Sequence, residues 1–177
     1  LTINADGGPL ISHIPFQLSE DGSYVAAHLV RSNPILQSLQ NSPLDAAIVV
    51  SGADSYISPD WYGAEDQVPT WNYAAVHVLG RAALTSEEGF RDLLDRLSAH
   101  FEARLLPKKP WTSNKMSDGV MERMMRGIVP CRLDIREVQS TWKLGQNKPE
   151  SARLGVADGL EGQGHAALAA LMRHPPS

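Results

Sequence analysis

Strand-forming segments joined by tight turns dominate this chain and limit its fold more than any other feature. Within residues 2–30, "ADGGPLISHIPFQL" and "EDGSYVAAHLV" each place a glycine turn before alternating apolar residues, a pattern typical of a β-meander. Further strands are predicted in "DAAIVVSG", ending at Gly52, and in "WNYAAVHVLGRAAL" and "IVPCRLDIREVQSTWKL". Six or so strands with mostly short connections favour an antiparallel, Greek-key-like β-barrel of the α+β class.

Helical patterns are fewer and fall between or after the strands. A short helix is predicted behind Asn33 and Pro34. An amphipathic helix is predicted in "TSEEGFRDLLDRLSAHFEARL", with a capping signal at Thr85. Its expected buried stripe is Phe90, Leu93, Leu94, Leu97 and Phe101. A shorter helix is predicted in "SDGVMERMMRG" and one or two more near the end. We expect a barrel domain over residues 1–148 and a helical tail over residues 149–177, packed on the barrel or on a partner subunit.

Charge and composition exclude several classes of function. The formal net charge is −4 and the pI is about 5.8, which argues against a large basic face for nucleic acid. A single cysteine, Cys131, excludes an internal disulfide framework and is expected to be a buried strand thiol. No apolar run reaches the roughly 18 residues of a membrane span, and no signal-peptide pattern is present, so a cytoplasmic location and no membrane partner are expected.

Common catalytic motifs are absent from the sequence. It contains no Gly-x-Ser-x-Gly elbow, no His-x-x-x-His pair, no phosphate-binding P-loop and no Gly-x-Gly-x-x-Gly turn. The tail resembles two helices around a glycine break, but its second helix lacks the Arg, Lys, Asn or Gln array that reads bases. No catalytic acid, base or metal ligand is predicted.

One segment is suited to an anion. In "HLVRSNP", Arg31 and Ser32 leave a strand just before a helix opens at Asn33 and Pro34. A guanidinium, a hydroxyl and helix N-terminal amides could bind a phosphate together. The alternative interpretation is a helix cap beside a surface arginine.

Several blocks of the sequence together resemble the PaiB family, described as FMN-binding negative transcriptional regulators. These blocks are "ISHIPF", "AAHLVRSNP", "SYISPDWYG", "VPTWNYAAVHVLGRA", "RGIVPCRLDIREVQSTWKLGQNKPE" and "GVADGLEGQGHAALAALM". The resemblance implies a split β-barrel of the FMN-binding type that works as a homodimer with the flavin at the subunit interface. It also implies that a helix and first strand usually present in the family are missing upstream of residue 1.

The resemblance also implies where the cofactor would bind. The phosphate would be held by Arg31, Ser32 and Asn33. The flavin ring would lie beside Ser12, His13, Ile14 and Pro15, with His28 on the adjacent strand. Residues that would close the site, some from the other subunit, are Tyr56, Ser58, Trp71 and Asn72. Residues expected to form a polar clasp after the last strand are Lys143, Gln146 and Asn147.

Other functions for the same pocket remain open at this point. One is a flavin-dependent oxidoreductase or flavin reductase, and another is a haem pocket with His13 or His28 as axial ligand. Direct binding to DNA is doubtful because the chain is acidic and has no convincing base-reading helix.

Overall fold

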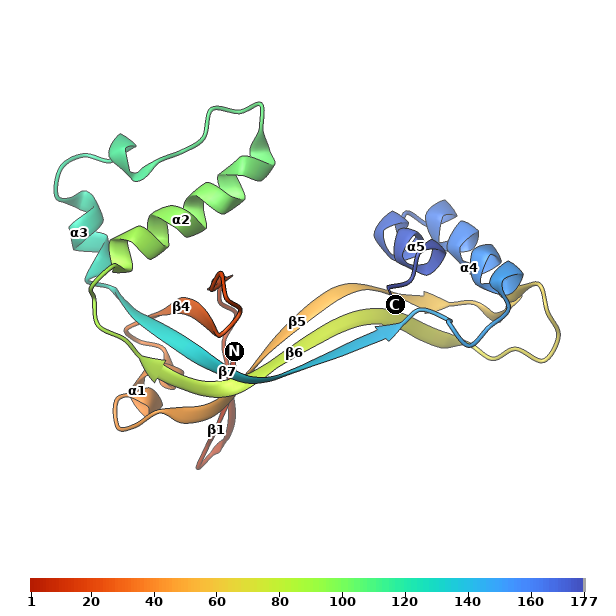
Figure 1. The fold of residues 1–177 in the computed structure, drawn as a ribbon, viewed down its shortest axis with the longest axis horizontal. Coiled ribbons are helices and arrows are strands. Elements are labelled where there is room, and N and C mark those ends of the chain that lie inside the picture. Colours follow the sequence, from red (N-terminus) through yellow and green to blue (C-terminus); the bar gives the residue numbers. More distant parts are fainter. Residues whose placement is uncertain (177) are drawn as a thin grey trace. The chain divides into compact units, whose positions relative to one another are not determined.

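The structure, a computed structural model, describes residues 1–176 and contains one seven-stranded antiparallel sheet that does not close into a barrel. The strand order is β2-β1-β5-β6-β7-β4-β3, and Figure 1 shows β5, β6 and β7 as its long strands. The meander expected over residues 2–30 is wrong, because β2 and β3 lie at opposite edges of the sheet and the segment forms two separate hairpins. The strands are β1 (Thr2–Ala5), β2 (Gly8–Ile11), β3 (Phe16–Leu18), β4 (Tyr24–Val30), β5 (Leu44–Ile57), β6 (Thr70–Leu84) and β7 (Ile128–Lys143). The predicted α+β class is confirmed.

The helices lie between or after these strands, as predicted. They are α1 (Pro34–Leu39), η1 (Pro59–Tyr62), α2 (Phe90–Glu102), η2 (Ala103–Leu105), η3 (Ser113–Lys115), α3 (Val120–Met125), α4 (Glu150–Gly162) and α5 (Ala166–Arg173). Among residues 1–176, no helix combines the length and apolar character needed to cross a bilayer.

Two compact units share the long strands β5, β6 and β7. The first unit comprises residues 1–48 and 78–137, and the second comprises residues 49–77 and the chain from residue 138 onward. In the first unit, alternate residues of β4 point into the core, where Val25, Ala27 and Leu29 are almost completely buried. Cys131 is buried there as expected, and burial raises the pKa of its thiol to about 11, so the thiolate is disfavoured.

The second unit has its own core, built by the predicted tail helices. Val156 and Leu160 of α4 pack with Leu168 and Met172 of α5 on Ile57, and all five are fully or almost fully buried. Burying side chains of this size contributes about 1.5–3 kcal/mol each. The tail helices therefore pack on strand β5 of their own chain.

Two sequence predictions about element boundaries are wrong. The strand expected to end at Gly52 continues to Ile57, because Ser55 and Ile57 are buried in the second unit. A Cβ atom at Gly52 would lie 3.0 Å from the carbonyl oxygen of Ala74, so this glycine permits close strand contact instead of ending the strand.

The amphipathic helix also differs from its prediction. It begins at Phe90 behind Gly89, which has a positive φ of 70°, whereas the Thr85 amide donates to the carbonyl oxygen of Pro130. Phe90 and Leu93 are buried as predicted, but Phe101 is 44% exposed because it lies in the last turn of α2. The buried stripe is thus shorter than the apolar periodicity suggests.

Candidate functional site

The predicted phosphate-binding segment follows β4 directly, and hydrogen bonds hold it in place. The Asn33 side chain accepts from the Ile35 amide at 2.9 Å and caps α1, while its Nδ2 donates to Ser12 Oγ at 2.9 Å. Asn33 therefore joins two predicted site segments, the one after β4 and the one after β2. The interpretation as a helix cap and the interpretation as a binding segment are compatible, because the cap uses Asn33 and leaves the Arg31 and Ser32 side chains at the surface.

Arg31 is anchored but remains accessible. Its Nε donates to the carbonyl oxygen of Arg126, and one terminal nitrogen lies 3.8 Å from the Glu87 carboxylate. The Arg31 side chain is 54% exposed, so the ion pair with Glu87 is weak and solvated. The Ile35 and Leu36 amides both donate to Asn33, and Pro34 has no N–H. An anion would consequently use the side chains of Arg31 and Ser32 and not these helix amides.

The segment from Ser12 to Pro15 crosses from β2 to β3. Ser12 makes a backbone hydrogen bond to Leu1, with 2.9 Å between N and O. Ile14 points into the first unit, where it lines a small core cavity with Val25 and Ala27. His13 and Pro15 are exposed. The alternation places two residues of this segment at the surface and one in the core.

His28 lies against α2. It alternates along β4 with the core residues Ala27 and Leu29, and its ring is tilted by 56° to the Phe90 ring with 6.1 Å between centroids. Its Nδ1 atom is buried and has no hydrogen-bond partner. Burial lowers the pKa of His28 below its ordinary value of 6.5, because the cationic ring loses its hydration.

The half-buried position of His28 predicts a loss of stability in acid. The pKa of His28 is lower in the folded chain than in the unfolded chain, so the unfolded chain binds the proton more readily. The free energy of unfolding should therefore fall as the pH drops below about 6.5. Urea unfolding between pH 7 and pH 5 should show a smaller fall for His28→Gln than for the wild type. The control variant His174→Gln, which alters an exposed histidine, should follow the wild type; equal slopes for wild type and His28→Gln would contradict the prediction.

The second group of predicted residues lies in the second unit. Tyr56 and Trp71 form an edge-to-face pair with 6.3 Å between ring centroids and 76° between planes. Tyr56 is 46% exposed and Trp71 is 55% exposed, so both rings present accessible aromatic surface. Ser58 lies at the start of η1 and makes no side-chain capping bond.

Asn72 faces the other side of β6 from this aromatic pair. It is 2% exposed, and its Nδ2 donates to Met172 Sδ at 3.4 Å. Neighbouring Trp71 and Tyr73 are exposed, as strand alternation requires. The amide thus contacts α5, and the two aromatic rings form the accessible face of this strand end.

The residues of the expected polar clasp bind their own chain. Lys143 Nζ donates to Thr70 Oγ1 at 2.8 Å. Gln146 accepts from the Leu144 amide at 2.8 Å and donates to the Trp142 carbonyl at 2.6 Å. Asn147 is exposed next to this turn. Lys143 and Gln146 therefore order the end of β7 and the start of β6, which carries Trp71.

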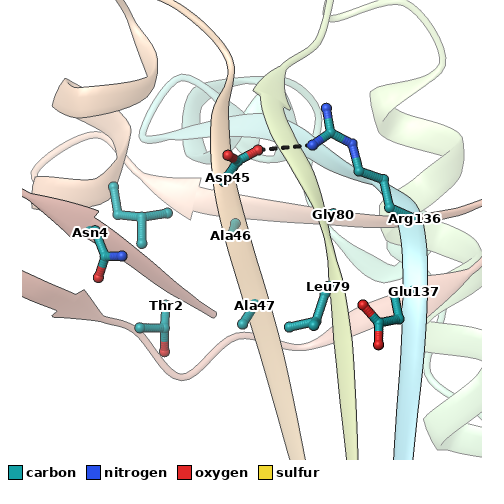
Figure 2. Close-up of a pocket in the computed structure, with 10 residues that line it drawn as sticks. Thr2, Asn4, Asp45, Ala46, Ala47, Leu79, Gly80, Arg136 and Glu137 are labelled. Carbon is teal, nitrogen blue, oxygen red and sulfur yellow. Dashed lines mark hydrogen bonds and ion pairs between the residues drawn. The ribbon is translucent and has the colours of Figure 1, made fainter.

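The structure also contains a depression that the sequence did not indicate. It has a volume of about 390 Å³ and lies over β1, β5, β6 and β7 of the first unit. Figure 2 shows Asp45 paired with Arg136 on one side of it and Glu137 beyond Leu79. The nitrogen and oxygen atoms of the Arg136–Asp45 pair are 3.1 Å apart. Asp45 also pairs with Arg81 at 3.1 Å. None of the predicted site residues lines this depression, and its residues come together only through the strand order.

Comparison with known proteins identifies the family. Residues 1–137 match the family described as "Putative FMN-binding domain". The chain belongs to this family. It is also 29% identical over 159 residues to protease synthase and sporulation protein PAI 2 of Bacillus subtilis, covering 89% of this chain and 75% of that protein. The resemblance to PaiB is thereby confirmed, and the chain is an FMN-binding domain of the PaiB type.

Solved structures share the fold. The FAD and heme binding protein from Mycobacterium smegmatis is 18% identical with a TM-score of 0.56, and the match covers 89% of this chain and 70% of that one. A conserved hypothetical protein from Mycobacterium tuberculosis is 15% identical with a TM-score of 0.56, covering 84% and 78%. At these identities the likeness concerns the fold alone.

Proposed function

We propose that this PaiB-type protein binds the FMN phosphate with Arg31 and Ser32, on a segment held in place by Asn33. The observation that carries the proposal is the anchored but exposed Arg31 guanidinium, followed in the chain by exposed Ser32, within the part of the chain that matches the FMN-binding family. A cation and a hydroxyl suit a phosphate monoester, since charge-assisted hydrogen bonds to its oxygens are strong. The donor set therefore fits the cofactor.

The flavin ring needs a flat, partly apolar surface. The Ser12–Pro15 segment is fixed to the phosphate segment by the Ser12–Asn33 hydrogen bond, so it is the natural neighbour of the ring. Tyr56 and Trp71 would provide aromatic contact from the partner subunit. When bound, FMN supplies hydride or electron transfer, and the chain supplies orientation and control of water access.

A homodimer is the second part of the proposal. The second unit exposes a set of large apolar side chains: Val49, Val50, Tyr56, Val68, Trp71, Tyr73, Val138 and Trp142. Aromatic residues are enriched at protein interfaces, and large apolar side chains gathered at a surface commonly mark such an interface. A second copy of the chain would bury it.

The third part of the proposal is a regulatory role in the cytoplasm. In this role the tail helices would not read DNA bases directly. Arg173 of α5 pairs with Asp158 at 2.8 Å and with Glu161 at 2.6 Å, both on α4. Arg153 of α4 donates to the backbone carbonyl of Arg173 at 3.1 Å. These cations join the two helices and are already paired within the tail, so they are not free to read bases. Regulation by this protein would then act through flavin or protein binding.

The test of the flavin site is an absorbance titration with FMN of the wild type and of Arg31→Ala. Losing a charge-assisted hydrogen bond of about 1.5–3 kcal/mol should raise the Kd by about 10–150-fold. Arg136→Ala is the matched control, because it removes another exposed cation of the first unit. Equal affinity of wild type and Arg31→Ala would reject the assignment. A Soret band after haem addition, without flavin binding, would favour the haem alternative.

A further inference from the structure

An exposed apolar surface lies at the end of α2 and is not part of the flavin site. Phe101 is 44% exposed, Leu105 is 52% exposed and Leu106 is 64% exposed. These residues belong to the last turn of α2, to η2 and to the loop that follows. Figure 1 shows the chain turning back at this end of α2, away from strands β4 and β7.

Cations surround these apolar side chains. Residues 100–115 contain four Lys or Arg and one acidic residue, in a chain with a net charge of −4. The Arg104 guanidinium lies over the Phe101 ring, 4.9 Å from its centroid. The single carboxylate, Glu102, pairs with Lys108 and accepts from the Trp111 amide at 2.8 Å. We call Phe101, Leu105, Leu106, Arg104, Lys108 and Lys109 the basic apolar tip.

The segment behind the tip is held on α2 by polar contacts. Arg91 pairs with Asp95 at 3.2 Å and with Glu122 at 3.3 Å, and it donates to Ser113 Oγ at 3.0 Å. Ser113 is buried. The bond from the Trp111 amide to Glu102 fastens the loop a second time. The basic apolar tip is therefore presented by an ordered segment, so little further ordering is needed for it to bind a surface.

We propose that the basic apolar tip docks this protein on an anionic lipid surface. Two adjacent leucines and a phenylalanine can enter the interface between headgroups and acyl chains, while flanking Arg and Lys contact anionic headgroups. Long cationic side chains suit this boundary because their aliphatic stems are apolar and their ends are charged. A nucleic acid would bind the cations through its phosphates, but the exposed leucines would contribute nothing to that binding.

The charge distribution supports this choice of partner. The chain as a whole is acidic, so its net charge opposes binding to an anionic membrane, and attraction requires a local concentration of cations. Each Lys or Arg near such a surface contributes about 1 kcal/mol, and this contribution is screened within a Debye length. The tip should bind reversibly, weaken with salt and orient the first unit at the membrane. This proposal does not rest on flavin binding.

The test is flotation of the full chain with vesicles of phosphatidylcholine and phosphatidylglycerol, mixed about seven to three, and with pure phosphatidylcholine vesicles. The wild type should float with the anionic vesicles at low salt and not with the neutral ones. Leu105→Ser with Leu106→Ser, and separately Lys108→Gln with Lys109→Gln, should each lower the partition coefficient about tenfold or more. Leu18→Ser is the matched control for the leucines, since Leu18 is 53% exposed in the same unit. Arg136→Gln is the control for loss of a cation.

Every outcome of the flotation test either supports or rejects lipid docking. The proposal of lipid docking is overturned if the wild type does not bind anionic vesicles, or if the Leu105→Ser, Leu106→Ser double variant binds them as tightly as the wild type does. Lysine-dependent binding to DNA or heparin that is unaffected by the leucine substitutions, without vesicle binding, would indicate a polyanion site and reject lipid docking. Thermal unfolding of each variant checks that the fold persists, and the exposed positions of the substituted side chains make that the expected result.

Discussion

Replacing Gly80 with alanine is expected to destabilise the protein severely. A Cβ atom at Gly80 would lie 1.9 Å from the backbone carbonyl oxygen of Asp134 and 2.8 Å from a methyl carbon of Leu133. The close atom is backbone of β7, so relief requires β6 and β7 to separate where both strands form the sheet. Overpacking of a core costs about 1–3 kcal/mol, and displacing a paired strand should cost at least about 3 kcal/mol.

Thermal unfolding followed by circular dichroism measures this effect. A loss of about 3 kcal/mol should lower the Tm by about 10 °C in a chain of this size. Gly162→Ala is the matched control, because a Cβ atom there meets no atom within 4 Å and alanine favours the helix that this residue ends. A Gly80→Ala variant with the Tm of the Gly162→Ala variant would show that the two strands are not so closely paired.

The strand order illustrates what sequence patterns can and cannot predict. Alternation and turn residues located most strands and the α+β class, because these signals are local to each segment. The role of Gly52 and Gly80 was not predictable, since it depends on the neighbouring strand that faces each glycine. Likewise, the pairing of Asp45 with Arg81 and Arg136 depends on sheet order and not on any motif.

The candidate site likewise has features that the sequence predicts and features that it does not. The cap at Asn33 was predictable from the Asn-Pro sequence, but its hydrogen bond to Ser12 joins segments 21 residues apart. The side of β6 on which Asn72 lies could not be predicted, because a strand with aromatic residues on one face and an amide on the other gives no sign of which face a helix covers. The contact with Met172 of α5 fixes the face on which Asn72 lies, and the position of Met172 depends on how the tail helices pack.

Truncating Trp71 should dissociate the proposed homodimer. Trp71 is 55% exposed, pairs with Tyr56 and neighbours exposed Tyr73 on the next outward position of β6. Truncating a large aromatic residue at the centre of an interface commonly weakens the free energy of association by about 2 kcal/mol or more. The dimer Kd of Trp71→Ala should therefore rise by about 30-fold or more. Sedimentation equilibrium over a concentration series measures this shift directly. The monomer itself should stay folded, because the buried neighbour Asn72 and the second core are unchanged.

The control separates this interface from the basic apolar tip. Phe101→Ala removes an aromatic side chain of similar exposure from the first unit and should leave the dimer Kd unchanged. If FMN lies between subunits, Trp71→Ala should also make flavin affinity depend on protein concentration, whereas Arg31→Ala should weaken it at every concentration. A monomeric wild type, or a Trp71→Ala dimer as tight as the wild type, would refute the assignment of this face. Because the two variants fail in different ways, they distinguish loss of the phosphate contact from loss of the partner that completes the pocket.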